Sequence, residues 1–247
     1  MLNIVIPMAG AGSRFAKAGF ELPKPLISVN GVPMIRLVIE NLRPKLDHRF
    51  IFLCQRAHIA QYELLDKLEA WAPGCTIVAV DGLTEGAAAT VLLAKELINN
   101  DEPLMIANSD QFVDIDIADY LSKLRGHDGL IMTMPAADPK WSYVAKDTRG
   151  FVTRVVEKEV ISKEATVGIY NFAKGRHFVS AAEAMMMRDE RVNGEFYVAP
   201  TYNQMITQGA HIVTQDIGDA MYGIGIPTDL NAFLQTTQCE RATKGLV

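Results

Sequence analysis

The sequence predicts an α/β fold, a mixed and mostly parallel sheet with helices on both faces. Short apolar runs rich in β-branched residues alternate with longer segments in which apolar residues recur every three or four positions. The runs are almost continuously apolar, which is typical of strands buried between two layers of helices. This alternation favours βα units around one sheet. The clearest predicted strands are 3–8, 49–54, 75–80, 103–109 and 129–135.

Three segments between these strands are predicted to be helices. Apolar residues lie on one face of each segment at helical spacing. The segments are 32–46, 58–72 and 86–98. The predicted buried face of the second segment consists of Ile59, Tyr62, Leu65 and Leu68.

The pattern changes after residue 135. Turn residues at 147–150, between two β-like runs, predict a hairpin. Further strands are predicted at 166–175, 210–217 and 220–226, and further helices at 177–189, 197–209 and 227–238. No Pro-, Ser- or Gly-rich linker interrupts the chain, so we expect residues 1–247 to form one domain with two halves, 1–135 and 136–247.

Composition excludes several classes of function. The chain of 247 residues has a formal net charge of −5, so it lacks the basic field of a nucleic-acid-binding protein. Its apolar runs are too short to cross a membrane, and its N-terminus lacks the layout of a signal peptide. Cys54, Cys75 and Cys239 are far apart, which is typical of thiols in a reducing compartment. We therefore expect a cytoplasmic protein that binds no nucleic acid and does not insert into a membrane.

A glycine-rich loop, AGAGSRF, follows the first predicted strand at residues 9–15. The P-loop pattern G-x-x-x-x-G-K-[ST] is absent from the chain. The dinucleotide pattern would place its third glycine at Phe15, and its acidic residue where the chain has Cys54 and Gln55. Dinucleotide binding is therefore disfavoured, and a tight turn without a ligand is the simplest alternative.

Two basic residues favour phosphate binding by this loop. Arg14 lies two residues beyond Gly12, and Lys24 lies between two prolines in ELPKPL. Amide groups of a loop that contains Gly10 and Gly12 can converge on phosphate oxygens, and the two cations add positive charge. The prolines restrict the backbone around Lys24, which reduces the entropy lost when the lysine is positioned. The loop is therefore interpreted as part of a triphosphate site.

Together, PMAGAGSRF and LPKPL resemble the signature of nucleotidyltransferases that make nucleoside-diphosphate sugars or related activated head groups. The resemblance covers most of the chain. It implies a glycosyltransferase-A-like (Rossmann-like) fold with a small acceptor-binding lobe, Mg²⁺ as the cofactor, and release of pyrophosphate. Residues 1–135 would then bind the nucleotide and residues 136–247 the acceptor. The nucleotide-binding residues implied are Ala9, Gly10, Ala11, Gly12, Ser13 and, in DGLTEGAAAT, Gly86.

The resemblance also assigns catalytic and metal-binding residues. Arg14 would hold the departing phosphates, and Lys24 would span the α-phosphate and the acceptor phosphate. Asp110, in ANSDQF, matches the metal-binding acid of the family, with a solvated helix cap as the alternative. The DID sequence at 114–116 resembles the DxD motif of glycosyltransferases, but the helical segment after it favours a capping role for Asp114 or Asp116.

Four further positions resemble the acceptor site of the family. In VVEKE, Glu157 would bind hydroxyls or amines of the acceptor, and Lys158 would bind its phosphate. Gly168, in TVGIYNF, would line the same pocket, and Glu195, in GEFYVAP, would contact the acceptor. Exposed Glu-Lys pairs are common, so the order of these motifs along the chain supports the assignment more than any single match does.

The chain departs from the family pattern at two places on the acceptor side. Gly223, in MYGIGIPT, replaces an aspartate that is a second metal ligand, so Asp110 would rely on phosphates and water, or on Asp216 or Asp219. The usual Thr-Asp after the acceptor segment is replaced by Ala199–Pro200. These departures indicate that the acceptor could differ from a common hexose phosphate.

The resemblance therefore predicts a Mg²⁺-dependent nucleotidyltransferase that joins an NTP to a sugar 1-phosphate or a similar phosphorylated acceptor, for surface or capsule polysaccharide synthesis. A cytidylyltransferase acting on a small non-sugar phosphate, such as a phosphocholine-like head group, is one alternative. A glycosyltransferase that consumes a nucleotide sugar is another, and a catalytically dead binding module is disfavoured by Arg14, Lys24 and Asp110. The base of the NTP is not determined by the sequence, and a homo-oligomer is compatible with it.

Overall fold

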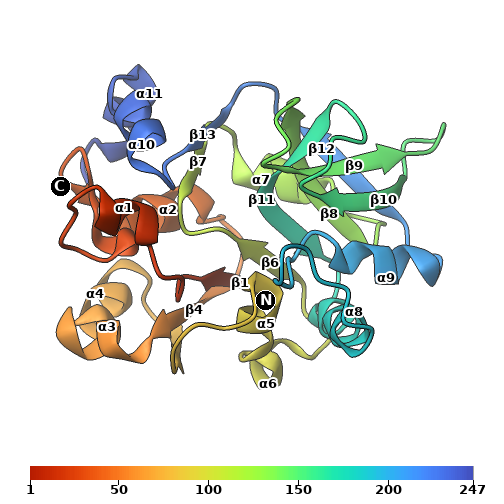
Figure 1. Ribbon diagram of the computed structural model, residues 1–247, viewed down its shortest axis with the longest axis horizontal. Coiled ribbons are helices and arrows are strands. Elements are labelled where there is room, and N and C mark those ends of the chain that lie inside the picture. The colour runs from red at the N-terminus through yellow and green to blue at the C-terminus, as the bar shows by residue number, and fades with distance from the viewer. Residues whose placement is uncertain (247) are drawn as a thin grey trace.

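Nine strands form one mixed sheet in the computed structural model, which describes residues 1–246 (Figure 1). These strands are β1 (Leu2–Pro7), β4 (His48–Gln55), β5 (Thr76–Val80), β6 (Leu104–Ala107), β8 (Gly129–Pro135), β9 (Ser142–Lys146), β10 (Val152–Glu157), β11 (Glu164–Phe172) and β12 (Ile212–Asp216). The main order is β10-β9-β11-β6-β1-β4-β5, and β8 pairs with both β11 and β12. The five clearest predicted strands are thus confirmed.

The strands of the first half are parallel. β1 lies between β4 and β6, with Ile4 opposite Phe50 on one side and Met105 on the other, and β5 extends the sheet beyond β4. Because the carboxyl ends of parallel strands meet at one edge of a sheet, the loops after β1 and β6 emerge side by side. This arrangement brings the glycine-rich loop and Asp110 to the same edge.

The second half continues the same sheet with mainly antiparallel pairing. β11 runs antiparallel to both β6 and β8, while β12 is parallel to β8. β9 and β10 form the predicted hairpin, in which the Gly150 amide donates to the Asp147 carbonyl across the turn at 3.0 Å. The sheet is therefore continuous from β5 to β10, as expected for a chain without a linker.

Helices cover both faces of the sheet. They are α1 (Ser13–Lys17), α2 (Met34–Leu42), α3 (Arg56–Gln61), α4 (Leu64–Trp71), α5 (Ala87–Leu92), α6 (Lys95–Ile98), α7 (Ile117–Ser122), α8 (Gly175–Met187), α9 (Thr201–Thr207), α10 (Pro227–Leu234) and α11 (Thr237–Thr243), with a short 3₁₀ helix η1 (Lys24–Leu26). Side chains of β1 alternate between the layers. Ile4 and Ile6 pack with α2, α4 and α7, and Val5 packs with α5, α8 and α9.

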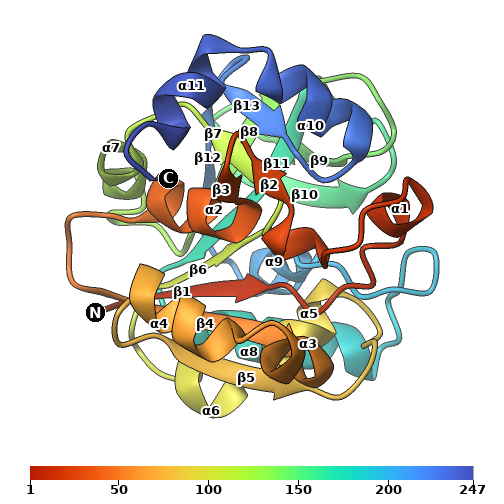
Figure 2. The same ribbon diagram turned by 90° about the vertical axis from the view of Figure 1, so that its left-hand side faces the viewer.

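A third apolar cluster lies outside α2. There α10 and α11 pack over α2, as Figure 2 shows, and Phe233, Leu37 and Phe15 are among the residues buried between them. Two short antiparallel pairs adjoin this cluster, β2 (Ser28–Val29) with β3 (Val32–Pro33) and β7 (Gln111–Val113) with β13 (Met221–Gly223). The C-terminal segment is thereby tied to the edge of the sheet that carries Asp110.

Two predicted helices are interrupted and a third begins late. The segment 58–72 is broken between α3 and α4, where Glu63 adopts a left-handed φ of 52°. The break changes the helical phase, so Leu64 is buried and Leu65 is 58% exposed, and the prediction of Leu65 on the buried face was wrong. The segment 86–98 likewise forms α5 and α6, and α9 begins at Thr201, after a turn in which the Thr201 amide donates to the Val198 carbonyl at 3.1 Å.

Within residues 1–246, no helix is both long enough and apolar enough to span a membrane.

Candidate active site

Lys24 and Asp110 form an ion pair across the sheet edge. The Lys24 Nζ lies 2.9 Å from the Asp110 Oδ2, and both side chains are about one-quarter exposed. Lys24 is the first residue of η1. It directly follows Pro23, which has an extended backbone and restricts the conformation of the chain before the helix. Asp110 lies between β6 and β7, three residues beyond the last residue of β6. The two charged residues singled out in the sequence are therefore in direct contact.

The glycine-rich loop lies against this ion pair. Gly12 has a φ of 60° and caps α1, and a Cβ placed on it would lie 3.4 Å from the Lys24 Cβ. Within the described part of the chain, the amide groups of residues 10–13 donate no hydrogen bond to the protein. Such a row of unpaired amides is the arrangement that binds phosphate oxygens. Arg14 is exposed on α1 and forms no ion pair with any residue from 1 to 246.

Gly225 packs directly on the carboxylate of Asp110. A Cβ on Gly225 would lie 2.3 Å from the Asp110 Oδ2, so no larger side chain fits without moving the carboxylate. The Ile224 amide also donates to the Asp110 carbonyl at 2.9 Å. Sequence analysis missed this role of Gly225. The paired glycines of MYGIGI were the only signal that could have indicated it.

Asp229 lies next to Gly223, the position at which the family pattern has its second aspartate. The Asp229 Oδ2 would be 3.4 Å from a Cβ on Gly223. Asp229 belongs to the first turn of α10, which follows β13. A carboxylate is therefore present beside the glycine, but it comes from a residue six positions later in the chain.

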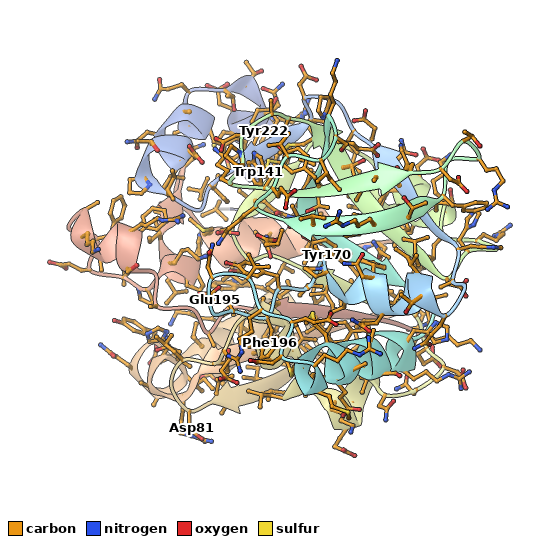
Figure 3. All side chains as sticks on the ribbon, turned by 45° about the vertical axis from the view of Figure 1, so that its right-hand side comes forward. Asp81, Trp141, Tyr170, Glu195, Phe196 and Tyr222 are labelled. Carbon is orange, nitrogen blue, oxygen red and sulfur yellow. The ribbon has the colours of Figure 1, made fainter. Side chains whose placement is uncertain are left out.

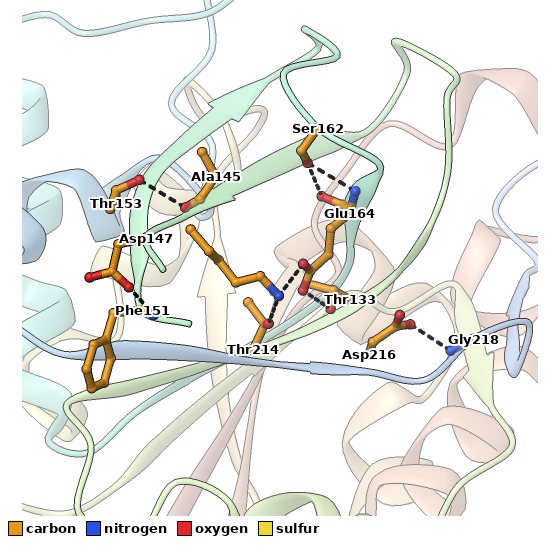
Figure 4. A network of polar contacts seen from close by, with 11 residues as sticks. Thr133, Ala145, Asp147, Phe151, Thr153, Ser162, Glu164, Thr214, Asp216 and Gly218 are labelled. Atoms are coloured by element: carbon orange, nitrogen blue, oxygen red, sulfur yellow. Dashed lines mark hydrogen bonds and ion pairs between the residues drawn. The ribbon is translucent and has the colours of Figure 1, made fainter. Parts of the chain in front are cut away.

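The other two acids considered as metal ligands lie elsewhere. Asp216 ends β12 and lines a separate hollow with Glu164, and its Oδ1 accepts a hydrogen bond from the Gly218 amide at 2.8 Å (Figure 4). Asp219 is exposed in the turn that follows. The structure thus brings neither residue beside Asp110.

The donors around Asp110 suit a magnesium ion shared with substrate phosphates. Mg²⁺ is usually held by one or two carboxylates, with phosphates and waters as the remaining ligands. Asp110 is partly exposed, and the lack of a side chain at Gly225 allows the carboxylate to occupy this position. Among residues 1–246 no group of three or more His, Cys, Asp or Glu side chains could hold a metal ion, and a phosphate-bound ion does not require one.

A hollow of about 290 Å³ lies beside the loop. It is lined by Ala9, Gly10, Ala11, Thr84, Gly86, Thr90 and Glu195, among others. Gly86 begins α5 with a φ of 121°, and a Cβ there would lie 2.5 Å from the Phe196 carbonyl oxygen. The Phe196 amide donates to the Glu85 carbonyl, and the Ala88 amide donates to the Phe196 carbonyl, at 2.7 and 3.0 Å. The two halves of the chain, one containing α5 and the other containing Phe196, are therefore joined at this point by backbone hydrogen bonds.

A second cavity, of about 240 Å³, lies on the other side of Ala87, which lines both spaces. Its other lining residues are Asn108, Lys140, Trp141, Ser142, Glu157, Thr166, Gly168, Tyr170, Tyr197, Val198 and Ala199. Figure 3 labels Trp141, directly before β9, Tyr170 on β11, and Glu195 on the segment between α8 and α9. Glu157 and Gly168 thus share one cavity, whereas Glu195 lies toward the first hollow.

Glu157 is buried at the end of β10. It is only 8% exposed, and its Oε2 accepts a hydrogen bond from the Ser142 hydroxyl. Burial raises the pKa of this carboxyl because the charged form is poorly solvated, although the Ser142 hydrogen bond and nearby Lys158 oppose the shift.

Lys158 is positioned by a left-handed backbone. Its φ is 58°, its amide donates to the Trp141 carbonyl at 3.0 Å, and its Nζ donates to the Tyr197 hydroxyl. The hydrogen bond with Tyr197 raises the pKa of Lys158, so the ammonium form is favoured. The lysine therefore presents a stable positive charge next to the second cavity.

Gly168 allows a close approach between β11 and the segment that follows β6. A Cβ on Gly168, where φ is 84°, would lie 2.2 Å from the Asn108 side-chain nitrogen. The Asn108 amide donates to the Gly168 carbonyl at 3.0 Å. This contact connects the second cavity to the segment that carries Asp110.

The DID sequence at 114–116 has a structural role. The Asp116 side chain accepts hydrogen bonds from the Ala118 and Asp119 amides and caps α7, as predicted for one of the two acids. Asp114 forms an ion pair with Arg241 of α11.

The site combines a loop of unpaired amides, a lysine–aspartate pair at the strand ends and two adjoining cavities. These features are typical of α/β proteins that bind nucleotide phosphates. Residues 4–216 match the family model described as nucleotidyl transferase. The chain belongs to this family.

Known proteins resemble the chain along its whole length. The bifunctional protein GlmU of Burkholderia orbicola is 28% identical over 249 residues, covering 97% of this chain. The chain spans about half the length of the curated relatives it matches, 51% in this case. The nucleoside-diphosphate-sugar pyrophosphorylase of Vibrio cholerae RC9 is 25% identical, with a TM-score of 0.78, covering 94% of this chain and 100% of that one.

A more distant structure shares the fold. The inositol-1-phosphate CTP transferase of T. maritima has a TM-score of 0.71 at 13% identity and covers 98% of this chain and 96% of that one. These neighbours confirm the glycosyltransferase-A-like architecture predicted from the sequence.

Proposed function

We propose that the protein is a nucleotidyltransferase that joins an NTP to a sugar 1-phosphate or a similar small phosphate monoester and releases pyrophosphate. The observation that carries the proposal is the contact of Lys24 with both Asp110 and Gly12, at the edge where two cavities adjoin. The hollow beside the loop would hold the nucleotide, and the cavity around Glu157 would hold the acceptor. Membership of the family supports this assignment.

The reaction requires alignment and charge neutralisation. An oxygen of the acceptor phosphate attacks the α-phosphorus of the NTP in line, and the bond from that phosphorus to the bridging oxygen of pyrophosphate breaks. A phosphate dianion is already nucleophilic, so no general base is needed. The amides of residues 10–13 and the guanidinium of Arg14 would hold the phosphates that depart. Lys158 would seat the phosphate of the acceptor.

Lys24 would reduce the repulsion between the two reacting phosphates. Its ammonium is paired with Asp110 in the free protein and can turn toward phosphate oxygens once substrates bind. Asp110 would hold Mg²⁺, with Asp229 as the nearest acid to the position of the missing aspartate. The ion would supply Lewis-acid neutralisation of phosphate charge.

A pyrophosphate-release screen tests the proposal. The four common NTPs would be combined with a panel of sugar 1-phosphates and other small phosphate monoesters in the presence of Mg²⁺. We expect one NTP to support release, and Lys24→Ala to lower kcat by about 10³-fold or more. Lys123→Ala, which alters an exposed lysine at the end of α7, is the matched control. Near-normal release by Lys24→Ala would contradict the assignment, and hydrolysis of a nucleotide sugar without any pyrophosphate release would favour a glycosyltransferase.

The role in the cell that we propose is the activation of a head group for surface polysaccharide synthesis. The capsule assignment rests on the sequence resemblance alone. The product formed in the screen would test this role. Polysaccharide synthesis requires a product in which a nucleoside diphosphate is linked to a polysaccharide precursor.

A further inference from the structure

We propose that the acceptor is a small phosphate monoester that also carries a positively charged amino or ammonium group, bound between Glu157 and the aromatic rings of the second cavity. This inference rests on the proposed function, because it specifies the acceptor of the same reaction. It is carried by three features of the cavity: a buried carboxylate that forms no ion pair, three aromatic side chains in the lining, and hydroxyl groups that are already engaged in hydrogen bonds.

Glu157 is a buried acid that forms no ion pair, and the neighbouring Lys158 acts on its charge only from a longer distance. Glu157 is 8% exposed and its one hydrogen-bond partner in the described chain is the neutral hydroxyl of Ser142. No lysine, arginine or histidine nitrogen from residues 1–246 lies within 4.0 Å of its oxygens. A buried carboxylate of this kind is costly unless a cation neutralises it. A ligand with an ammonium group would supply that cation.

Three aromatic side chains line the same cavity as Glu157. Trp141 precedes β9, Tyr170 belongs to β11, and Tyr197 comes from the segment before α9. Aromatic faces attract ammonium groups through the ring quadrupole, and cages of such faces recognise quaternary ammonium ligands. The combination of a carboxylate with several rings therefore favours a cation over a neutral group.

Two of these rings already attract ammonium groups of the chain itself. The Lys140 Nζ lies 5.0 Å from the Trp141 ring centroid, and the Lys158 Nζ lies 4.6 Å from that of Tyr197. These lysines also provide positive charge for the phosphate of an acceptor. The cavity and its rim thus contain both ammonium groups and a carboxylate, which are the charges that a zwitterion with a phosphate and an ammonium group would require.

Most of the hydroxyls in the cavity are already engaged with one another. Ser142 donates to Glu157, Thr166 and Tyr170 share a hydrogen bond of 2.9 Å, and the Tyr197 hydroxyl accepts from Lys158. A hexose would bring several hydroxyls that each need a partner on burial. An ammonium group surrounded by methyl or methylene groups needs only the carboxylate and the ring faces. The lining therefore favours the charged alkyl group over the sugar.

Three acceptors test the inference on the wild-type protein. They are phosphocholine, its neutral isostere 3,3-dimethylbutyl phosphate, and glucose 1-phosphate. Pyrophosphate release with the active NTP and the Kd from calorimetry would be measured for each. We expect phosphocholine to exceed the neutral isostere by about tenfold or more in kcat/KM and in affinity. Equal values for the isostere, or a preference for glucose 1-phosphate, would overturn the inference.

A pair of variants tests whether the discrimination depends on Glu157. Glu157→Gln keeps the shape of the side chain and removes its charge, so the preference for phosphocholine over the isostere should fall to about onefold to threefold. Glu159→Gln, at an exposed position two residues later, should keep the wild-type ratio. An unchanged ratio in Glu157→Gln would contradict the inference. A variant that failed to fold would be recognised by circular dichroism, and the wild-type comparison would still decide.

The two proposals fail in different ways. Release of pyrophosphate with glucose 1-phosphate alone would overturn the cationic acceptor and keep the nucleotidyltransferase. Absence of pyrophosphate with every NTP and acceptor would contradict the nucleotidyltransferase, while the calorimetric comparison of phosphocholine with its isostere would still test the cavity.

Discussion

Gly225 and Asp110, which are 115 positions apart, are in contact at the end of β6, where a Cβ on the glycine would lie 2.3 Å from the Asp110 Oδ2. The position of the Asp110 carboxylate, which we propose as the metal ligand, is therefore restricted by Gly225 in the C-terminal segment. Ile224 and Gly225 come directly after β13, whose pairing with β7 fixes their position.

The first prediction concerns this contact. Gly225→Ala should displace the carboxylate of Asp110 and lower kcat by about 100-fold, because displacements near 1 Å have effects of this size in active sites. Pyrophosphate release at a series of Mg²⁺ concentrations would measure it. Gly223→Ala is the matched control, since its Cβ would meet its nearest atom at 3.4 Å. Wild-type activity in Gly225→Ala would show that the contact is irrelevant.

The second prediction concerns the connection between the two halves. Gly86→Ala combines a φ of 121° with a Cβ 2.5 Å from the Phe196 carbonyl oxygen, so we expect it to lower the free energy of unfolding by about 2–4 kcal/mol. Gly82→Ala has a similar left-handed φ of 86° in open space and should cost about 1 kcal/mol. Urea denaturation would compare them, and equal losses would refute a role for the Phe196 contact.

The third prediction concerns the pH dependence caused by Glu157. Burial raises its pKa above the ordinary value of 4.5, so the folded protein binds the proton more tightly than the unfolded chain does. The contribution of Glu157 to stability is therefore most favourable below pH 4.5 and is lost as the pH rises through the raised pKa. Relative to wild type, Glu157→Gln should gain stability between pH 4 and pH 7. Denaturation curves at both pH values would measure this, and parallel profiles for the two proteins would count against it.

The fourth prediction has the opposite sign and uses Glu164. Burial opposes the ionised form of Glu164, but the contacts with Lys146 and Thr133 outweigh it and lower the pKa of this carboxyl. Figure 4 shows the contact between Thr133 and Glu164. The Lys146 Nζ lies 2.5 Å and the Thr133 Oγ1 2.9 Å from its carboxylate. This stabilisation is present above pH 4.5 and is lost as the pH falls through the lowered pKa.

Glu164→Gln should therefore lower the free energy of unfolding at pH 7 by about 1–2 kcal/mol and have less effect at acid pH. The same denaturation series would measure it. Glu159→Gln, which is exposed, provides the baseline. A loss that stays constant down to acid pH would indicate a packing effect instead of a charge effect.

Local patterns were sufficient to predict most of the fold. Continuous apolar runs identified the buried parallel strands because their residues are covered on both faces, as Ile4 and Val5 are. The sequence did not indicate which residues of 58–72 face the core after the helix break. The break occurs at Glu63, which has a left-handed backbone, and no glycine marks this position. Leu65 was therefore assigned to the wrong face.

The candidate site was predictable where its residues belong to short motifs. Lys24 and Asp110 were singled out separately, and the structure joins them in one ion pair. The contact of Gly225 with Asp110 and the position of Trp141 beside Glu157 depend on segments that meet only in the folded chain. A single sequence contains no information about such pairings, and so the aromatic lining of the second cavity was not foreseen.

The connection between Glu85–Ala88 and Phe196 has a consequence for the evolution of the protein. Its hydrogen bonds join backbone groups and depend on side-chain identity only at Gly86, which has to remain small. Tyr197, which is only partly buried next to Phe196, can therefore be exchanged by mutation while the wall of the cavity keeps its position. Under the proposed function, such substitutions would change the acceptor while the phosphate-binding loop, Lys24 and Asp110 stay the same.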